Sequence, residues 1–148
     1  MDIAAVATRK YLANQFPNQV CTERVVYDFA VDAGATGALD LWEASDAVVV
    51  IGFHTIVKTA CTSGGSATVK VGHTDDDDAF CTIVQGAVAS LTAAAHIVPP
   101  VVLSEGTPNT AVFPVPVKLA AAKKILMTIG TAALTAGKIE FVVQYIKL

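Results

Sequence analysis

The amino-acid sequence predicts an all-β protein, an antiparallel β-sandwich of jelly-roll type with a short N-terminal arm or helix. Apolar and polar residues alternate with a period of two in several segments, most clearly at residues 138–147. Roughly eight such short segments are separated by turns rich in Gly, Pro, Asp and Thr, as in sandwich folds. No internal repeat or linker marks a second domain, so we divide the chain into an arm at residues 1–22 and a sandwich domain at residues 23–148.

Length and composition agree with a single folded domain and give no reason to expect nucleic-acid binding. The chain has 148 residues, of which 53% are hydrophobic and 16% charged, against about a quarter charged in ordinary domains. A chain of this length buries its own core without disulfides or a structural metal. The net charge of −3 and the scattered lysines and arginines provide no basic patch for phosphates.

The N-terminal segment differs from the rest of the chain. Ile3, Val6 and Tyr11 lie near one stripe of a short helix, which ends before Pro17. Two interpretations remain open: a leader without fixed structure, or an arm that orders on a partner with these three residues in the interface. The first residues contain no apolar run of the kind found in secretory signals, so we expect folding in a cytoplasm.

Alternating segments predict the strands of the first half. Residues 23–31 and 35–42 form a plausible hairpin around an Asp-Ala-Gly turn at residues 32–34. Residues 47–59 are apolar on both faces, with Ile51 and Phe53 expected on the same one. Such a strand is central in a sandwich or lies against a neighbouring subunit. Residues 67–72 form the next strand, after a Gly- and Ser-rich turn.

The second half contains an acidic run and further strands. The run from Asp75 to Asp78 is expected as a loop. Composition leaves residues 88–95 open between a helical turn and a strand. Prolines confine the strand at residues 110–117 to a sheet edge. The remaining predicted strands are residues 80–84, 124–130 and 138–147.

Residues 79–117 carry a single charge, Glu105. Soluble domains normally place charges along every segment, because each strand or helix has a face toward water. The segment is not built to cross a membrane, because Pro99 and Pro100 interrupt it. We therefore expect another protein subunit to cover part of this surface, with Val101 and Phe113 in the contact.

The acidic run is also the densest group of possible metal ligands. Calcium binds several carboxylate oxygens, but the residues from His73 to Asp78 lack the ligand spacing of an EF-hand loop. A solvated loop is therefore favoured, and no metal or cofactor is expected. The three cysteines, Cys21, Cys61 and Cys81, lack zinc-site spacing, and they form either one disulfide or free thiols.

No catalytic motif accompanies the possible nucleophiles and bases. His54 lies within a predicted strand, and His73 lies beside the acidic run. His96 lies in the uncharged stretch. There is no G-x-S-x-G or HExxH motif. The Gly-Ala-Thr-Gly segment at residues 34–37 lacks the Lys and Ser/Thr of a phosphate loop, so it indicates a tight turn. We therefore do not expect an enzyme. We expect Trp42 and Tyr145 to be packing or interface aromatics and not a ligand platform.

Three segments carry a resemblance to a known family. They are YDFAVDAGATGALDL at residues 27–41, VKTACTSGGSATVKV at residues 57–71 and IGTAALTAGKIEFVVQYIKL at residues 129–148. Each joins two strands through a Gly-containing turn. In this order they resemble the small capsid decoration (cement) proteins of tailed bacteriophages. The resemblance covers about residues 25–148 and leaves the arm unassigned.

The resemblance implies a β-sandwich subunit, often a homotrimer, on the outer surface of a phage head. In the virion it would bind the major capsid protein and hold the subunits of the shell together. Phage head-fibre and tail proteins share such β-rich patterns, so a different place in the virion stays open. A competing hypothesis is a lectin-like binding module for carbohydrate or calcium, which Trp42 and the run from Asp75 to Asp78 favour.

Overall fold

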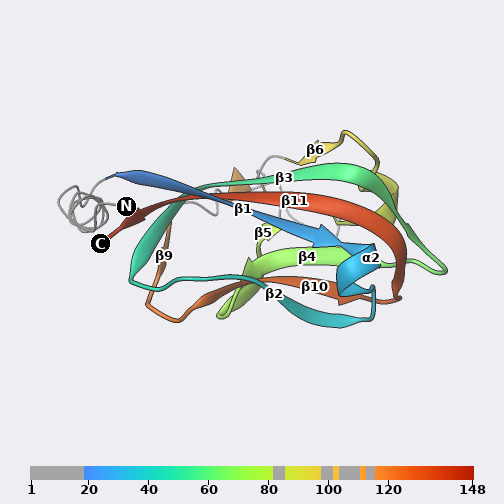
Figure 1. The fold of residues 1–148 in the computed structure, drawn as a ribbon, viewed down its shortest axis with the longest axis horizontal. Coiled ribbons are helices and arrows are strands. Elements are labelled where there is room, and N and C mark those ends of the chain that lie inside the picture. The colour runs from blue at the N-terminus through green and yellow to red at the C-terminus, as the bar shows by residue number, and fades with distance from the viewer. Residues whose placement is uncertain (1–18, 82–85, 98–101, 104–110, 113–115) are drawn as a thin grey trace, which may run out of the picture.

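The chain forms two antiparallel β-sheets that pack face to face (Figure 1). The residues described by this computed structural model are 19–81, 86–97, 102–103, 111–112 and 116–148. The five-stranded sheet has the order β1-β11-β3-β6, and β9 also pairs with β3; the four-stranded sheet has the order β2-β10-β4-β5. This confirms the predicted all-β sandwich, whereas the jelly-roll connectivity stays a prediction.

The elements have the following bounds. In the first half they are β1 Val20–Asp28, α2 Phe29–Asp32, β2 Gly37–Glu43, β3 Val48–Ser63, β4 Thr68–His73 and β5 Asp76–Cys81. A 3₁₀ helix, η1, spans Val88–Ser90. The later strands are β6 His96–Ile97, β7 Val102–Leu103, β8 Ala111–Val112, β9 Val117–Leu119, β10 Lys124–Gly130 and β11 Leu134–Lys147. Strands β7 and β8 pair only with each other among the described strands.

The core lies between the sheets and is centred on aromatic rings from both. Phe53 of β3 stacks on Phe80 of β5, with ring centroids 4.7 Å apart, and lies 6.0 Å from the ring of Phe141 of β11. All three side chains are almost completely buried. In β11, Ile139 and Val143 are buried beside Phe141, as the predicted alternation requires, but Glu140 and Val142 on the opposite face are also only 7% exposed. Offset aromatic stacking adds to the free energy gained by burying the rings.

Strand β3 changes its buried face in the middle. Val48 and Val50 are buried in its first part, and Phe53 and Val57 in its second part. The pairing register with β11 shifts between them, which leaves Ile51 as an extra residue. A β-bulge of this kind reverses the alternation from that point on. The prediction that Ile51 and Phe53 share a face is therefore wrong, although the predicted central position of the strand is confirmed.

The predicted hairpin of the first two strands is wrong, because β1 and β2 belong to different sheets. Strand β1 ends at Asp28, whose carboxylate accepts a hydrogen bond from the Ala30 amide and caps the short helix α2. The carboxylate of Asp32 accepts from the Asp28 amide. A Cβ at Gly34 would lie 2.2 Å from the Leu134 carbonyl oxygen, so a glycine lets the connection cross between the sheets against β11.

Most of the acidic run is strand and not loop. Strand β5 begins at Asp76, which pairs with His73 of β4, so the tight turn between them contains Asp75. The backbones approach closely here, since a Cβ at Gly72 would lie 2.0 Å from the Asp76 carbonyl oxygen. The prediction of a loop through Asp78 is therefore wrong for the residues after the turn. Sequence alone does not show the cross-strand partner that keeps three carboxylates in a strand.

The other predicted strands agree with the structure to different degrees. Strand β10 has the predicted bounds, and β11 begins at Leu134, before the predicted residue 138. The open choice at residues 88–95 is resolved by η1, which is helical. Parts of residues 80–84 and 110–117 lie outside the described residues, as do residues 1–18. Strand β1 begins at Val20, before the predicted domain boundary at residue 23.

Candidate functional site

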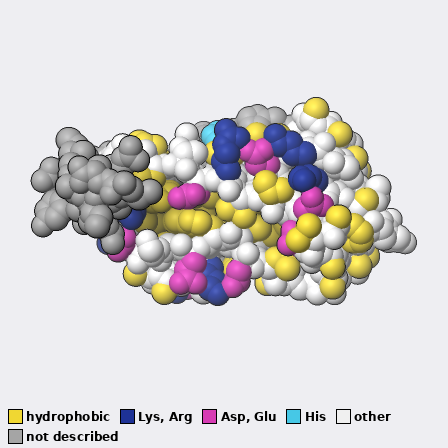
Figure 2. Space-filling view, viewed as in Figure 1, with side chains coloured by type: hydrophobic (Ala, Val, Ile, Leu, Met, Phe, Trp, Pro, Cys, Tyr) yellow, Lys and Arg dark blue, Asp and Glu magenta, His cyan; other side chains and the backbone are white. Residues whose placement is uncertain are grey.

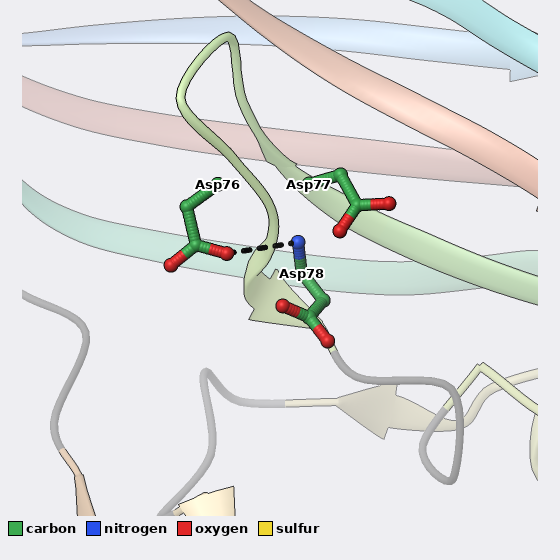
Figure 3. A group of neighbouring side chains, drawn as sticks. All are labelled: Asp76, Asp77 and Asp78. Atoms are coloured by element: carbon green, nitrogen blue, oxygen red, sulfur yellow. Dashed lines mark hydrogen bonds between the residues drawn. The ribbon is translucent and has the colours of Figure 1, made fainter.

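Three aspartates gather at the start of β5 (Figure 3). Ligand oxygens of Asp76, Asp77 and Asp78 all lie within 4.8 Å of one another. The Lys70 Nζ atom on β4 lies 3.1 Å from both carboxylate oxygens of Asp77 and 3.9 Å from an oxygen of Asp78. The Asp78 amide donates to the Asp76 carboxylate over 3.4 Å, as Figure 3 shows. The lysine ammonium therefore already supplies a positive charge to this cluster.

The titration of this region follows from its neighbours. Burial, and then the hydrogen bond and charge of Asp76, raise the pKa of Asp78, while Lys70 acts in the opposite direction. At the turn, a hydrogen bond from Lys123 Nζ over 2.7 Å lowers the pKa of Asp75. The His73 Nδ1 atom accepts from the Asp75 amide. These contacts offset part of the negative charge of the cluster, which makes it a less favourable calcium site.

A charged group that the sequence did not indicate lies on the outer face of the five-stranded sheet. Glu140 of β11 bonds Arg24 of β1 and, at 2.7 Å, Lys58 of β3. Its side chain is 9% exposed, so its charge depends on these two cations. Hydrogen bonds from Lys58 and Arg24 lower the pKa of Glu140. Basic and acidic side chains lie together on the upper part of the face in Figure 2.

The candidate nucleophiles and bases do not converge. His54 lies on β3 and His73 on β4, in different sheets, and the side chain of His96 is outside the described part. All three cysteines are free thiols, which resolves the alternative left open by the sequence. Burial raises the pKa of Cys61 to about 11 and that of Cys81 to about 12, so neither forms a thiolate near neutral pH.

Trp42 is half-buried and packs within the chain. Its ring lies 5.0 Å from that of Tyr145 across the two sheets. This contact agrees with the packing alternative of the predicted role of Trp42. In the preceding connection, Gly34 lies against Leu134. The tight hairpin turn predicted at residues 34–37 is wrong, because the connection crosses between the two sheets.

Some apolar residues in the described part of the uncharged stretch are covered by the chain itself, whereas residues 92–94 are exposed. Phe80, Cys81 and Leu91 are each 1% exposed and belong to the core. For these residues no second subunit is needed to explain their apolar character. The predicted interface residues lie outside the described residues: Ile3, Val6, Tyr11, Val101 and Phe113. Their role therefore stays a prediction.

A pocket lies where the edges of the two sheets meet. It is about 80 Å³ in volume and is lined by β1 and β2, with Val25, Leu39 and Leu41 among its apolar residues and two carboxylates, Asp32 and Asp40. Figure 2 shows hydrophobic side chains gathered in the hollow between the upper and lower sheets. The sequence does not indicate this surface, because the pocket forms between β1 and β2, and their outer positions in the two sheets follow only from strand pairing.

The comparisons with known proteins give matches in structure and none in sequence. No protein-family model matches the chain, and no curated protein is similar to it in sequence. A chain in the capsid asymmetric unit of cyanophage Pam1 matches with a TM-score of 0.57 at 14% identity, over 90% of this chain and 88% of that one. A chain in the acid-stable capsid structure of Helicobacter pylori bacteriophage KHP30 matches with a TM-score of 0.55 at 15% identity, over 87% and 89%.

The likeness is one of fold. It spans nearly the full length of both chains in each comparison, so the whole sandwich is shared and not a fragment of it. At this sequence identity it shows the architecture alone, and roles are not transferred by it. Among the described residues, no helix is long and apolar enough to cross a membrane.

Proposed function

We propose that this chain is a structural virion protein that binds the outer surface of a phage head and cements major capsid protein subunits together. The observation that carries the proposal is the shared fold: two capsid structures from different phages each contain a chain that matches over most of its length. The sequence resemblance to decoration proteins points in the same direction and rests on different grounds. The proposed role is non-enzymatic and needs no cofactor.

The architecture suits a protein that acts by burying surface. A stable interface needs roughly 800 Å² on each partner. The aromatic core, which spans both sheets, provides a rigid body that presents such a surface without chemistry. The proposed partners are the major capsid protein and further copies of this chain in a homotrimer. The proposed contact residues are Ile3, Val6, Tyr11, Val101 and Phe113.

The test is occupancy on shells assembled from the major capsid protein encoded in the same genome. Wild-type chain is expected to co-sediment with the shells, and Val101→Asp or Phe113→Asp to reduce occupancy by about tenfold or more, because a charge is desolvated in the contact. Val31→Asp is the matched control, since Val31 on α2 is 81% exposed. Normal occupancy of both variants would refute the interface, and no binding by wild type would refute the cement role.

The second candidate is a β-sandwich binding module for calcium or carbohydrate. The cluster of Asp76, Asp77 and Asp78 is the observation that favours it. The ammonium group of Lys70 beside these carboxylates weighs against it. A head-fibre or tail protein would have the same fold but a different position in the virion. Labelling the chain in intact virions and locating the label by electron microscopy distinguishes these positions.

A further inference from the structure

The sandwich has two outer strands on one side. Within the described part of the chain, β1 pairs only with β11, and β2 pairs only with β10. The pocket lined by both strands shows that these edges lie next to each other. Beyond β11, by contrast, β3 pairs with both β6 and β9. A long outer strand presents a row of backbone amide and carbonyl groups with which a further strand can pair.

Strand β1 has apolar side chains on both faces near its two ends, with three exposed polar residues, Thr22 to Arg24, between them. Val20 and Val26 point to the outer face and are 49% and 47% exposed, which places two of the exposed large hydrophobic residues of the described chain on this strand. On the inner face, Val25 is half-buried and lines the pocket together with Leu39 and Leu41. A strand added beside β1 would cover apolar surface on both faces at once, at about 25 cal/mol per Å².

We propose that this edge is the docking site for the N-terminal segment, residues 1–18, of a second copy of this chain, which adds a strand to β1. The proposal rests on the homo-oligomer in the proposed function and specifies how that oligomer forms. The segment directly precedes β1. At about 3.3 Å per residue it spans up to about 60 Å, against a radius of gyration of about 15 Å for a domain of this length. It is therefore long enough to reach a neighbouring copy.

Proline disfavours the shortest way of folding the segment back on its own strand. Pro17 lies shortly before the start of β1 at Val20. The commonest two-residue hairpin turns need a positive φ at their first central position, whereas a proline ring holds φ near −65°. We therefore expect the segment to pair with the edge of a second copy, and the test below separates this from pairing within one chain.

One carboxylate at the pocket can pair with the segment. Residues 1–18 contain one acid, Asp2, and two adjacent cations, Arg9 and Lys10. Two carboxylates line the pocket, Asp32 of α2 and Asp40 of β2, and Asp40 already pairs with Lys124. A cation of the docked segment would therefore lie near Asp32, and such a contact helps to fix the register of pairing.

The direct test is a disulfide trap in the purified full-length chain. Cys21 on β1 is the native reporter, because it is partly exposed while Cys61 and Cys81 are buried. Lys10, Leu12 and Asn14 are replaced by cysteine one at a time and mildly oxidised. We expect a disulfide-linked dimer for at least one variant, lost when Cys21→Ser is added. A link within one chain, or no link at any position, would overturn the proposal.

A second measurement does not depend on the register. Val26→Lys places a charge at the edge of β1, where the side chain is half-exposed in the isolated chain, so folding is retained. Light scattering is expected to give a native mass that falls to the 15.3 kDa of one chain, whereas Val31→Lys keeps the wild-type mass. An unchanged mass for Val26→Lys would overturn the docking site. Neither measurement uses capsid shells, so its failure is separate from failure of the cement role.

Discussion

Glu140 is a buried acid in the middle of β11. It is held there by contacts from both neighbouring strands, Arg24 on β1 and Lys58 on β3. An acid buried without partners would destabilise the sheet, so the three residues depend on one another. The sequence shows the acid but not its partners, because they are brought to it by strand pairing.

This contact predicts a pH dependence of stability. The pKa of Glu140 is lowered in the fold from its ordinary value of 4.5. Its stabilising contribution is therefore complete above pH 4.5 and is lost as the pH falls through the lower pKa of the folded state, because the unfolded chain binds the proton first. Glu140→Gln should lower the free energy of unfolding at neutral pH, and the difference from wild type should shrink below pH 4.5.

Urea unfolding of both proteins at a series of pH values measures this difference. Glu43→Gln is the control, since Glu43 is exposed and lies 3.8 Å from Lys124. It should show little effect at any pH, as exposed pairs contribute about 0–1 kcal/mol. A wild-type advantage over Glu140→Gln that persists unchanged into acid would contradict the role assigned to the carboxylate.

At the scale of the element, the bulge in β3 decides which residues enter the core. Val48 and Val50 are buried before Ile51, and Phe53 after it. Deleting Ile51 would remove the extra residue and place Val50 and Phe53 two positions apart, so that strict alternation keeps both parts of the strand facing the core. We expect only a small loss in the free energy of unfolding, because no buried side chain is transferred to water.

Chemical denaturation compares this deletion with deletion of Gly64. That glycine lies in the exposed connection between β3 and β4, and nothing lies within 4 Å of a Cβ built on it. Its removal should cost little, because surface connections tolerate changes of length. A much larger loss for the Ile51 deletion than for the Gly64 deletion would mean that Ile51 is not simply the extra residue of the bulge.

At the scale of the whole molecule, the proposed function predicts a calcium-independent oligomer. Light scattering behind a sizing column should give three times the 15.3 kDa chain mass, with or without calcium. The melting temperature should also be insensitive to calcium, because a ligand that binds only the folded state would raise it. Lys70 already lies at the carboxylates of Asp77 and Asp78. Assembly or stabilisation by calcium would instead support the binding module.

Local pattern was enough for some elements of the fold. The alternation in β11 and the bounds of β10 could be predicted, because each strand has one face toward the core and a period of two follows directly. The connection after β1 could not, since Asp-Ala-Gly is compatible both with a hairpin and with a crossing between sheets. The backbone of Leu134, which is distant in sequence, packs so closely against Gly34 that no Cβ would fit. This contact decides between the two connections.

The sequence by itself determined the all-β class, the alternation that fills the core and the lack of a catalytic motif, because these depend on side-chain type and spacing. Tertiary structure alone decided the sheet to which each strand belongs, the cations around Glu140, the position of Lys70 beside the aspartates and the outer edge of β1. Each of these joins residues far apart in the chain. Such pairings are selected by the packing of two whole sheets, and no local pattern encodes them.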